Sequence, residues 1–235
     1  MPKSYEDVEE NINSIISSVR QAAPTLHKAG TFPGKAFDAL VHHLTRQKIN
    51  NSIETGSGAS TLLFSHLSQH HTVFAVDDGN ESITGTRRNP LLRSDSVTFV
   101  EGPTQKTLPA YQFTQPLQVA LIDGPHGYPF PELEYYYIYP HLEPGALLII
   151  DDINVRTIYN LFRFLRADKM FHLEQVVTTT AFFRRTDAPT FNPIGDGWWE
   201  QGYNRLPAGP YMPRHVIKSL LPSPFLRFLR RLKSQ

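Results

Sequence analysis

The chain has 235 residues, enough for one domain with a sizeable core, and its 23 Lys and Arg against 22 Asp and Glu give a net charge of +1. No global charge attracts nucleic acid, so no nucleic-acid partner is expected. The absence of cysteine excludes disulfides, thiolate zinc sites and a cysteine nucleophile. Because the first ten residues are polar and no apolar run could span a bilayer, a cytoplasmic enzyme is expected.

Two helices are expected ahead of the first strand. Apolar residues recur at helical spacing between Val8 and Val19, and Pro24 would end this helix. A second helix is predicted over residues 35–46. Residues 1–46 are therefore interpreted as an N-terminal helical segment.

From residue 47 onward, short apolar segments alternate with amphipathic ones. The apolar segments predict strands and the amphipathic ones predict helices. This alternation is typical of a doubly wound α/β fold, in which helices cover both faces of a mostly parallel sheet. The sheet domain is expected to span 47–186. Its predicted strands are 49–54, 72–76, 97–100, 117–122, 146–150, 171–177 and 179–184, and its predicted helices are 60–69, 131–141 and 156–167.

The segment 187–235 is interpreted as a C-terminal appendage. It is rich in proline, glycine and aromatic residues, including Trp198 and Trp199, and from Arg214 onward it is basic with no acidic residue. Such an end could dock on its own chain or on a second subunit, which would give a homo-oligomer. Peripheral contact with an anionic membrane is the alternative.

A glycine turn joins the first strand to the next helix, in the segment Glu54-Thr55-Gly56-Ser57-Gly58-Ala59-Ser60. Glycines there let the backbone approach a ligand, and the helix start offers free N–H groups. Thr61 replaces the third glycine of a dinucleotide fingerprint, and no phosphate-binding Gly-Lys-Ser/Thr follows. Glu54 would repel a pyrophosphate but suits a ligand with an ammonium group, such as the amino acid end of S-adenosylmethionine.

An acidic pair follows the second strand, about twenty residues beyond the glycine turn. Asp77, at the end of that strand, could accept hydrogen bonds from both hydroxyls of a ribose. Asp78 is either a second contact or a solvated neighbour. A plain turn followed by a surface acid is the alternative to a ligand site.

The sequence resembles the class I methyltransferases over roughly residues 30–185. The resemblance implies a Rossmann-like sheet of seven strands in the order 3-2-1-4-5-7-6, with the seventh antiparallel, and S-adenosylmethionine as the cofactor. It also implies that Gly56 and Gly58 line the cofactor and that Asp77 holds its ribose. The motifs that carry it are Glu54-x-Gly56-x-Gly58, Val73-Phe74-Ala75-Val76-Asp77, Glu101-Gly102, Ile122-Asp123-Gly124-Pro125-His126 and Ile149-Ile150-Asp151-Asp152.

One departure from this family affects adenine recognition. Many relatives carry Gly-Asp after the third strand, and the acid contacts the adenine, whereas this chain has Gly102-Pro103. Recognition would then fall to neighbours such as Thr104 or Gln105. The predicted cofactor-binding residues are Glu54, Gly56, Ser57, Gly58, Ser60, Asp77, Asp78, Gly102, Thr104 and Asp123.

Asp123 and the pair Asp151-Asp152 follow two strands that the family makes adjacent, about 5 Å apart. Carboxylates without sulfur select a hard cation, Mg²⁺ before Mn²⁺ or Ca²⁺. Successive strand residues point to opposite faces, so Asp151 and Asp152 could share one ion only if the chain has turned by Asp152. Alternatively, Asp123 contacts the cofactor or a helix cap, and the pair caps the next helix.

The acidic cluster also resembles that of the metal-dependent sugar O-methyltransferases of the macrocin and mycinamicin type, which act on macrolide antibiotics. Those enzymes carry Asp-Gly-Asp-His after the fourth strand, where this chain has Asp123-Gly124-Pro125-His126. The resemblance implies metal ligation by Asp123, Asp151 and Asp152, with His126 as the general base. A histidine can take a proton from a hydroxyl near neutral pH.

These patterns leave three functions open. The first is metal-assisted O-methylation of a hydroxyl on a sugar or small secondary metabolite, with Tyr128 and Phe130 as candidates to line the acceptor pocket. The second is metal-independent N- or O-methylation of a small molecule. The third is a non-catalytic nucleotide-binding or membrane-tethered scaffold protein.

Overall fold

The computed structural model describes residues 5–26, 32, 34–77, 79 and 81–205. The chain divides into two compact units, Met1–Gly195 with the sheet and Asp196–Gln235. Within its described part, the second unit holds two 3₁₀ turns, η4 (Trp198–Glu200) and η5 (Gly202–Arg205). Asp78 and the basic end from Arg214 lie outside the described residues, so their predicted roles stay predictions.

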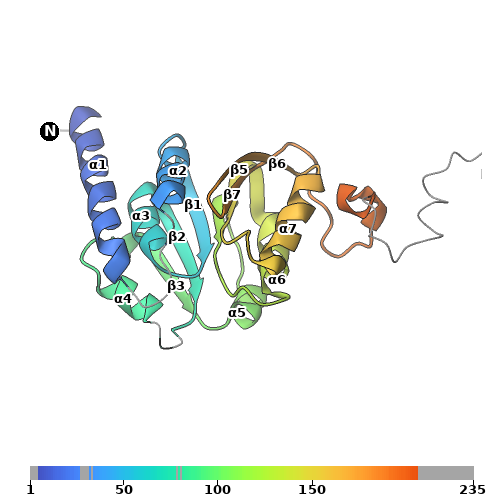
Figure 1. Ribbon diagram of the computed structural model, residues 1–235, viewed down its shortest axis with the longest axis horizontal. Helices are drawn as coiled ribbons and strands as arrows, with labels where there is room; N and C mark the ends of the chain where they lie inside the picture. Colours follow the sequence, from blue (N-terminus) through green and yellow to red (C-terminus); the bar gives the residue numbers. More distant parts are fainter. Residues whose placement is uncertain (1–4, 27–31, 33, 78, 80, 206–235) are drawn as a thin grey trace, which may run out of the picture. The chain divides into compact units, whose positions relative to one another are not determined.

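Seven strands form one sheet in the order β3-β2-β1-β4-β5-β7-β6 (Figure 1). The strands β1 to β5 pair in parallel with one another, and β7 pairs antiparallel with both β5 and β6. This confirms the predicted fold class and strand order. The strands are β1 (Ile49–Thr55), β2 (Ser68–Ala75), β3 (Val97–Glu101), β4 (Leu117–Ile122), β5 (Leu142–Ile150), β6 (Phe171–Val177) and β7 (Thr180–Arg185).

Helices cover both faces of the sheet (Figure 1). Side chains alternate along β4, so that Val119 and Leu121 face one core and Ala120 and Ile122 face the other. On the first face lie α1 (Tyr5–Ala22), α2 (Gly34–Leu44), α3 (Ala59–Leu67) and α4 (Ser82–Arg88). On the second lie α5 (Thr104–Ala110), α6 (Phe130–Ile138) and α7 (Arg156–Ala167).

Several local features differ from the sequence predictions, and among them β5 begins at Leu142, four residues before its predicted start. The helix predicted over 60–69 ends at Leu67, because β2 begins at Ser68, four residues before the predicted start of the strand. The short helices α4 and α5 were not predicted. Each contains a poor helix former, Gly85 in α4 and Pro109 in α5, which interrupts the helical pattern. Within the described residues, no helix combines the length and apolar character that a membrane span requires.

Candidate active site

The carboxyl ends of β1, β4 and β5 lie in register at one edge of the sheet. Thr55 pairs with Ile122, which in turn pairs with Ile150. The residues that follow these three leave the sheet side by side, at the edge where open α/β sheets bind their ligands. They are Gly56, Asp123 and Asp151.

The glycine turn packs closely on the end of β4. Gly56 has a φ of +94°, and its N–H donates to the carbonyl of Phe74, 2.9 Å away. A Cβ on Gly56 would lie 2.5 Å from the carbonyl oxygen of Asp123. Position 56 therefore requires glycine both for its backbone conformation and for this contact. The N–H of Gly58 donates to the hydroxyl of Thr61, 3.0 Å away, at the start of α3.

The carboxylate of Glu54 faces the interior of the turn. It is 1% exposed, and its oxygens accept hydrogen bonds from the hydroxyls of Ser60, at 2.6 Å, and Thr61. The Nε2 atom of His71 lies 3.2 Å from the same carboxylate. The predicted contact between Glu54 and a ligand's ammonium group therefore stays a prediction.

His71 is a buried residue next to this turn that the sequence analysis did not single out. The structure places it inside β2, on the face shared by Val73 and Ala75. Alternation with these two apolar residues was the available signal.

Asp77 follows β2 and contacts the first turn of α4. Its Oδ2 atom accepts hydrogen bonds from the backbone N–H of Thr84, 3.1 Å away, and from the Thr84 hydroxyl. The hydroxyl of Ser57 donates to the carbonyl of Ser82, at 3.4 Å, so the glycine turn also contacts α4. Asp77 is exposed, at the strand end next to the glycine turn, where a ribose contact was predicted.

The segment after β3 leaves one predicted residue partly exposed and buries another. Gly102 has a φ of +136°, and its N–H donates to the carbonyl of Ala75, at 2.9 Å. Thr104 is only 3% exposed and lies at the start of α5. A contact between Thr104 and adenine stays a prediction.

A group of possible metal ligands lies beside the glycine turn. Asp123, His126 and Asp152 each offer one ligand atom, and these atoms lie within 4.8 Å of one another. The Nε2 atom of His126 is 3.3 Å from Oδ2 of Asp152. Asp152 has a φ of +54°, so the chain has left the strand by this residue, as a shared ion would require.

Asp151 lies outside this group. Its side chain is buried, and Oδ1 accepts hydrogen bonds from the hydroxyls of Thr180, at 2.6 Å, and Thr179, at 3.4 Å. The structure thus brings together Asp123, His126 and Asp152, whereas the sequence grouped Asp123, Asp151 and Asp152 as ligands. Ligation by Asp151 stays a prediction.

Burial and neighbouring negative charges raise the pKa values of acids at this edge. Burial, followed by the neighbouring charges of Asp151 and Asp152, raises the pKa of Asp123 well above its usual range. Burial also raises the pKa of Asp151, against the opposing hydrogen bond from Thr180. Carboxylates that disfavour one another's charge in this way favour a bound cation.

Glu134 is a further buried acid that the sequence reasoning missed. It is 0% exposed, and its Oε2 accepts a hydrogen bond from the hydroxyl of Thr55, 2.8 Å away. The same Thr55 oxygen accepts from the N–H of Asp123, at 3.1 Å, so Glu134 supports the turn after β4. Burial raises the pKa of Glu134 to about 7, although the hydroxyls of Thr104 and Thr55 lower it. The available signal was an acid on the apolar stripe of α6, whose buried residues are Pro131, Glu134, Tyr135 and Ile138.

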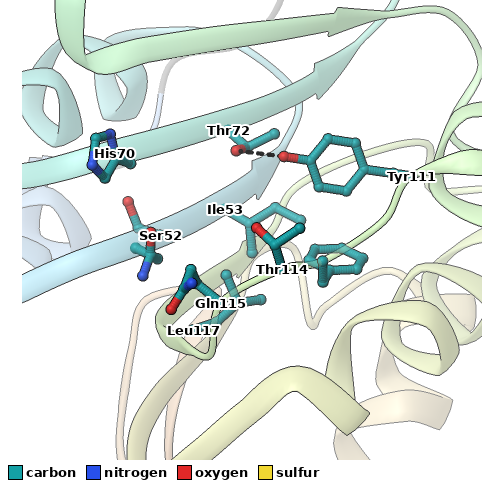
Figure 2. A pocket seen from close by; sticks show the side chains of 10 residues that line it. Ser52, Ile53, His70, Thr72, Tyr111, Thr114, Gln115 and Leu117 are labelled. Carbon is teal, nitrogen blue, oxygen red and sulfur yellow. Dashed lines mark hydrogen bonds between the residues drawn. The ribbon is translucent and has the colours of Figure 1, made fainter.

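A small hollow elsewhere on the sheet is separate from this edge. Figure 2 shows it between β1, β2 and the segment after α5, where the hydroxyls of Thr72 and Tyr111 lie 3.4 Å apart. Its volume is about 60 Å³, room for little more than a few water molecules. Its lining contains none of the acids at the strand ends.

Comparison with known proteins agrees with this fold. Residues 53–153 match a family model described as a methyltransferase domain. No curated protein matches the chain in sequence. The matched range includes the glycine turn, Asp77, Asp123, His126 and Asp152.

Solved methyltransferase structures share the fold at low sequence identity. An O-methyltransferase from Bacillus cereus in complex with SAH has 17% identity and a TM-score of 0.56, over 79% of this chain and 93% of that one. An O-methyltransferase of tomaymycin synthesis from Streptomyces achromogenes, in complex with SAM, has 16% identity and a TM-score of 0.56, over 73% and 89%. A methyltransferase from Geobacter sulfurreducens has 12% identity and a TM-score of 0.56, over 80% and 100%. The chain therefore contains a segment that matches a methyltransferase domain, within a fold that it shares with solved methyltransferases.

Proposed function

We propose that the protein transfers a methyl group from S-adenosylmethionine to a hydroxyl of a small molecule, with assistance from a metal ion and from His126. The observation that carries this proposal is the group Asp123, His126 and Asp152, beside the glycine turn at the carboxyl edge of the sheet. A base and a group of cation ligands beside this turn would suit a methyl donor bound there.

The strand ends supply the parts of a cofactor site. The N–H groups at the start of α3, after Gly56 and Gly58, are suited to the carboxylate of the amino acid end. The exposed carboxylate of Asp77 is suited to the ribose hydroxyls. The adenine would then lie toward Gly102, after the neighbouring strand β3.

The donor set fits a hard divalent cation. Asp123 and Asp152 each offer a carboxylate oxygen, and the chain has no cysteine to supply a thiolate. A bound Mg²⁺ would lower the pKa of an acceptor hydroxyl and neutralise the crowded acids. Asp123 and Asp152 would hold the ion, with Asp151 behind them as a ligand or as a support.

His126 is placed to remove the acceptor's proton. Its side chain is 46% exposed, and Asp152 lies 3.3 Å from its Nε2 atom. Asp152 can orient the ring and stabilise its charged form after proton transfer. Because the sulfonium is already activated, displacement then depends mainly on alignment of the acceptor oxygen with the methyl group.

Metal-independent methyl transfer is a second candidate, favoured by two observations. The His126–Asp152 pair resembles a base with its orienting acid and needs no ion for that role, and the hydroxyls of Thr179 and Thr180 already hydrogen-bond to Asp151. In that case the site is compatible with a nitrogen atom or an oxygen atom as the methyl acceptor.

Calorimetry and turnover assays separate these functions. Wild-type protein is titrated with S-adenosylmethionine, and methyl transfer to a panel of hydroxylated sugars and secondary metabolites is measured with Mg²⁺ and with EDTA. Binding together with EDTA-sensitive turnover is expected. EDTA-insensitive turnover would establish the metal-independent candidate, and absence of cofactor binding would refute both.

A single-residue test addresses the ligand group. Asp152→Asn is expected to raise the Mg²⁺ concentration needed for half-maximal activity, whereas Asp95→Asn, at an exposed acid outside the site, leaves it unchanged. Identical Mg²⁺ titrations for Asp152→Asn and wild type would remove Asp152 from the ligand group.

A further inference from the structure

A chain of buried polar contacts lies beneath the glycine turn, between β1 and β2. Glu54 and His71 face each other with side-chain exposures of 1% and 0%, and Nε2 of His71 lies 3.2 Å from Oε1 of Glu54. Nδ1 of the same ring lies 2.8 Å from the hydroxyl of Ser52, which lies 2.8 Å from the hydroxyl of Ser68. The His71 ring stacks on Phe64, with 4.5 Å between centroids and 12° between planes, so its orientation is fixed.

The directions of these hydrogen bonds determine where the protons are. The hydroxyl of Ser68 donates to the carbonyl oxygen of His70, 3.1 Å away, and a carbonyl can only accept. Ser68 therefore accepts from Ser52, which uses the single proton of the Ser52 hydroxyl. The Ser52 oxygen is left as an acceptor for His71, so Nδ1 of His71 must carry a proton.

The other ring nitrogen faces a carboxylate. Glu54 accepts hydrogen bonds from the hydroxyls of Ser60 and Thr61, and the Thr61 hydroxyl is free to donate because it accepts from the N–H of Gly58. With Glu54 ionised, a bare nitrogen lone pair at Nε2, 3.2 Å from this carboxylate, would be repelled, which favours a proton on Nε2 as well. A histidine with both nitrogens protonated has a positive charge.

We propose that His71 is a buried, positively charged counter-ion of Glu54 and positions the glycine turn for the cofactor. A lone carboxylate at this depth would be strongly disfavoured, whereas a paired one can hold its hydrogen-bond donors. Glu54 fixes Ser60 and Thr61 in the first turn of α3, and Thr61 fixes the N–H of Gly58. His71 is therefore a positioning residue that acts through Glu54. As a statement about cofactor binding, this inference rests on the proposed function.

The first experiment reads the protonation of His71 in the wild-type protein. In ¹⁵N-labelled protein near neutral pH, both ring nitrogens of His71 are expected to show the NMR shifts of protonated nitrogen and to couple to protons. One ring nitrogen with the shift of an unprotonated imidazole would overturn the proposal. This measurement requires no variant and no cofactor.

The second experiment is a double-mutant cycle between His71→Phe and Glu54→Gln. His71→Phe keeps a ring against Phe64 but leaves Glu54 as an unpaired buried charge, so the Kd of S-adenosylmethionine is expected to rise about tenfold or more. Adding Glu54→Gln removes the unpaired charge, so the double variant is expected to bind more tightly than His71→Phe alone. Effects that simply multiply would show that His71 only fills space and would overturn the proposal.

Controls separate this inference from the proposed function. His70→Phe makes the same substitution at the exposed neighbouring histidine of β2 and is expected to leave the Kd unchanged. Thermal unfolding of the four proteins of the cycle, without cofactor, is expected to show the same rescue in Tm by the second substitution. If wild type fails to bind S-adenosylmethionine, the proposed function fails, while the NMR shifts and the unfolding cycle still decide the charge of His71.

Discussion

Replacement of Gly56 by alanine should destabilise the fold through two separable effects. The first is conformational, because Gly56 has a φ of +94°, in the left-handed region that side chains disfavour. The second is steric, because the new Cβ would lie 2.5 Å from the carbonyl oxygen of Asp123, a backbone atom that cannot rotate away. Either the turn or the end of β4 must move.

The magnitude follows from the two effects. A left-handed conformation costs an alanine about 1–2 kcal/mol. Forcing an additional carbon into a close-packed region costs a further ~1–3 kcal/mol. The free energy of unfolding should therefore fall by about 2–5 kcal/mol, a large part of the ~5–15 kcal/mol of an ordinary domain.

Gly145→Ala provides the matched control. Gly145 has a φ of +84°, but a Cβ there would meet no atom within 4 Å, so only the conformational cost of about 1–2 kcal/mol applies. Urea denaturation of the two variants and wild type gives both losses, and equal m-values would show that the unfolded states are comparable. Equal losses for Gly56→Ala and Gly145→Ala would refute the close contact between the glycine turn and Asp123.

The remaining predictions concern Asp77, His126 and Glu134. Asp77→Ala should weaken S-adenosylmethionine binding about tenfold or more in calorimetry. Thr84→Val removes only the hydroxyl contact with Asp77 and keeps the backbone one, so it should cost about 1 kcal/mol of stability and leave the affinity intact. His126→Ala should lower kcat about 10²–10⁴-fold without a matching loss of cofactor affinity, and a parallel loss of both would make His126 structural. Burial raises the pKa of Glu134 in the folded protein from 4.5 to about 7. Between these pH values Glu134 ionises more readily in the unfolded chain, so the free energy of unfolding should fall by about 3 kcal/mol as the pH rises. Urea denaturation across that pH range should show the fall in wild type and its loss in Glu134→Gln; an unchanged slope in the variant would contradict the assignment.

The fold could be predicted because most of its elements carry a local signal. The predicted bounds of α7 and β6 match the structure, and the apolar runs of β4 and β5 are buried as a doubly covered sheet requires. The start of β2 carried no such signal. Its first residues, Ser68 to His70, are polar, and their extended conformation is set by pairing with β1 rather than by their own propensity.

The candidate site could be predicted only as far as strand ends determine it. Asp77, Asp123 and Asp152 were placed at the correct edge, because parallel strands bring their carboxyl ends together. The separate environments of Asp151 and Asp152 depend on a left-handed residue at 152, which the sequence allows but does not impose. Glu134 reaches Thr55 across 79 positions of sequence, a distance over which local patterns carry no information.

The two buried acids on either side of the β1 tip have different partners, and this difference bears on the proposed ligands. Toward α3, Glu54 faces His71 at 3.2 Å. Toward α6, the hydrogen bonds described for Glu134 and Asp151 come from the hydroxyls of Thr55, Thr179 and Thr180, which carry no charge. Glu54 thus has a histidine beside it, whereas on the β4–β5 side burial raises the pKa of Glu134 and Asp151, and burial together with neighbouring acids raises the pKa of Asp123. A site with that imbalance stabilises a cation supplied from outside, which is what a sulfonium and a divalent metal ion have in common.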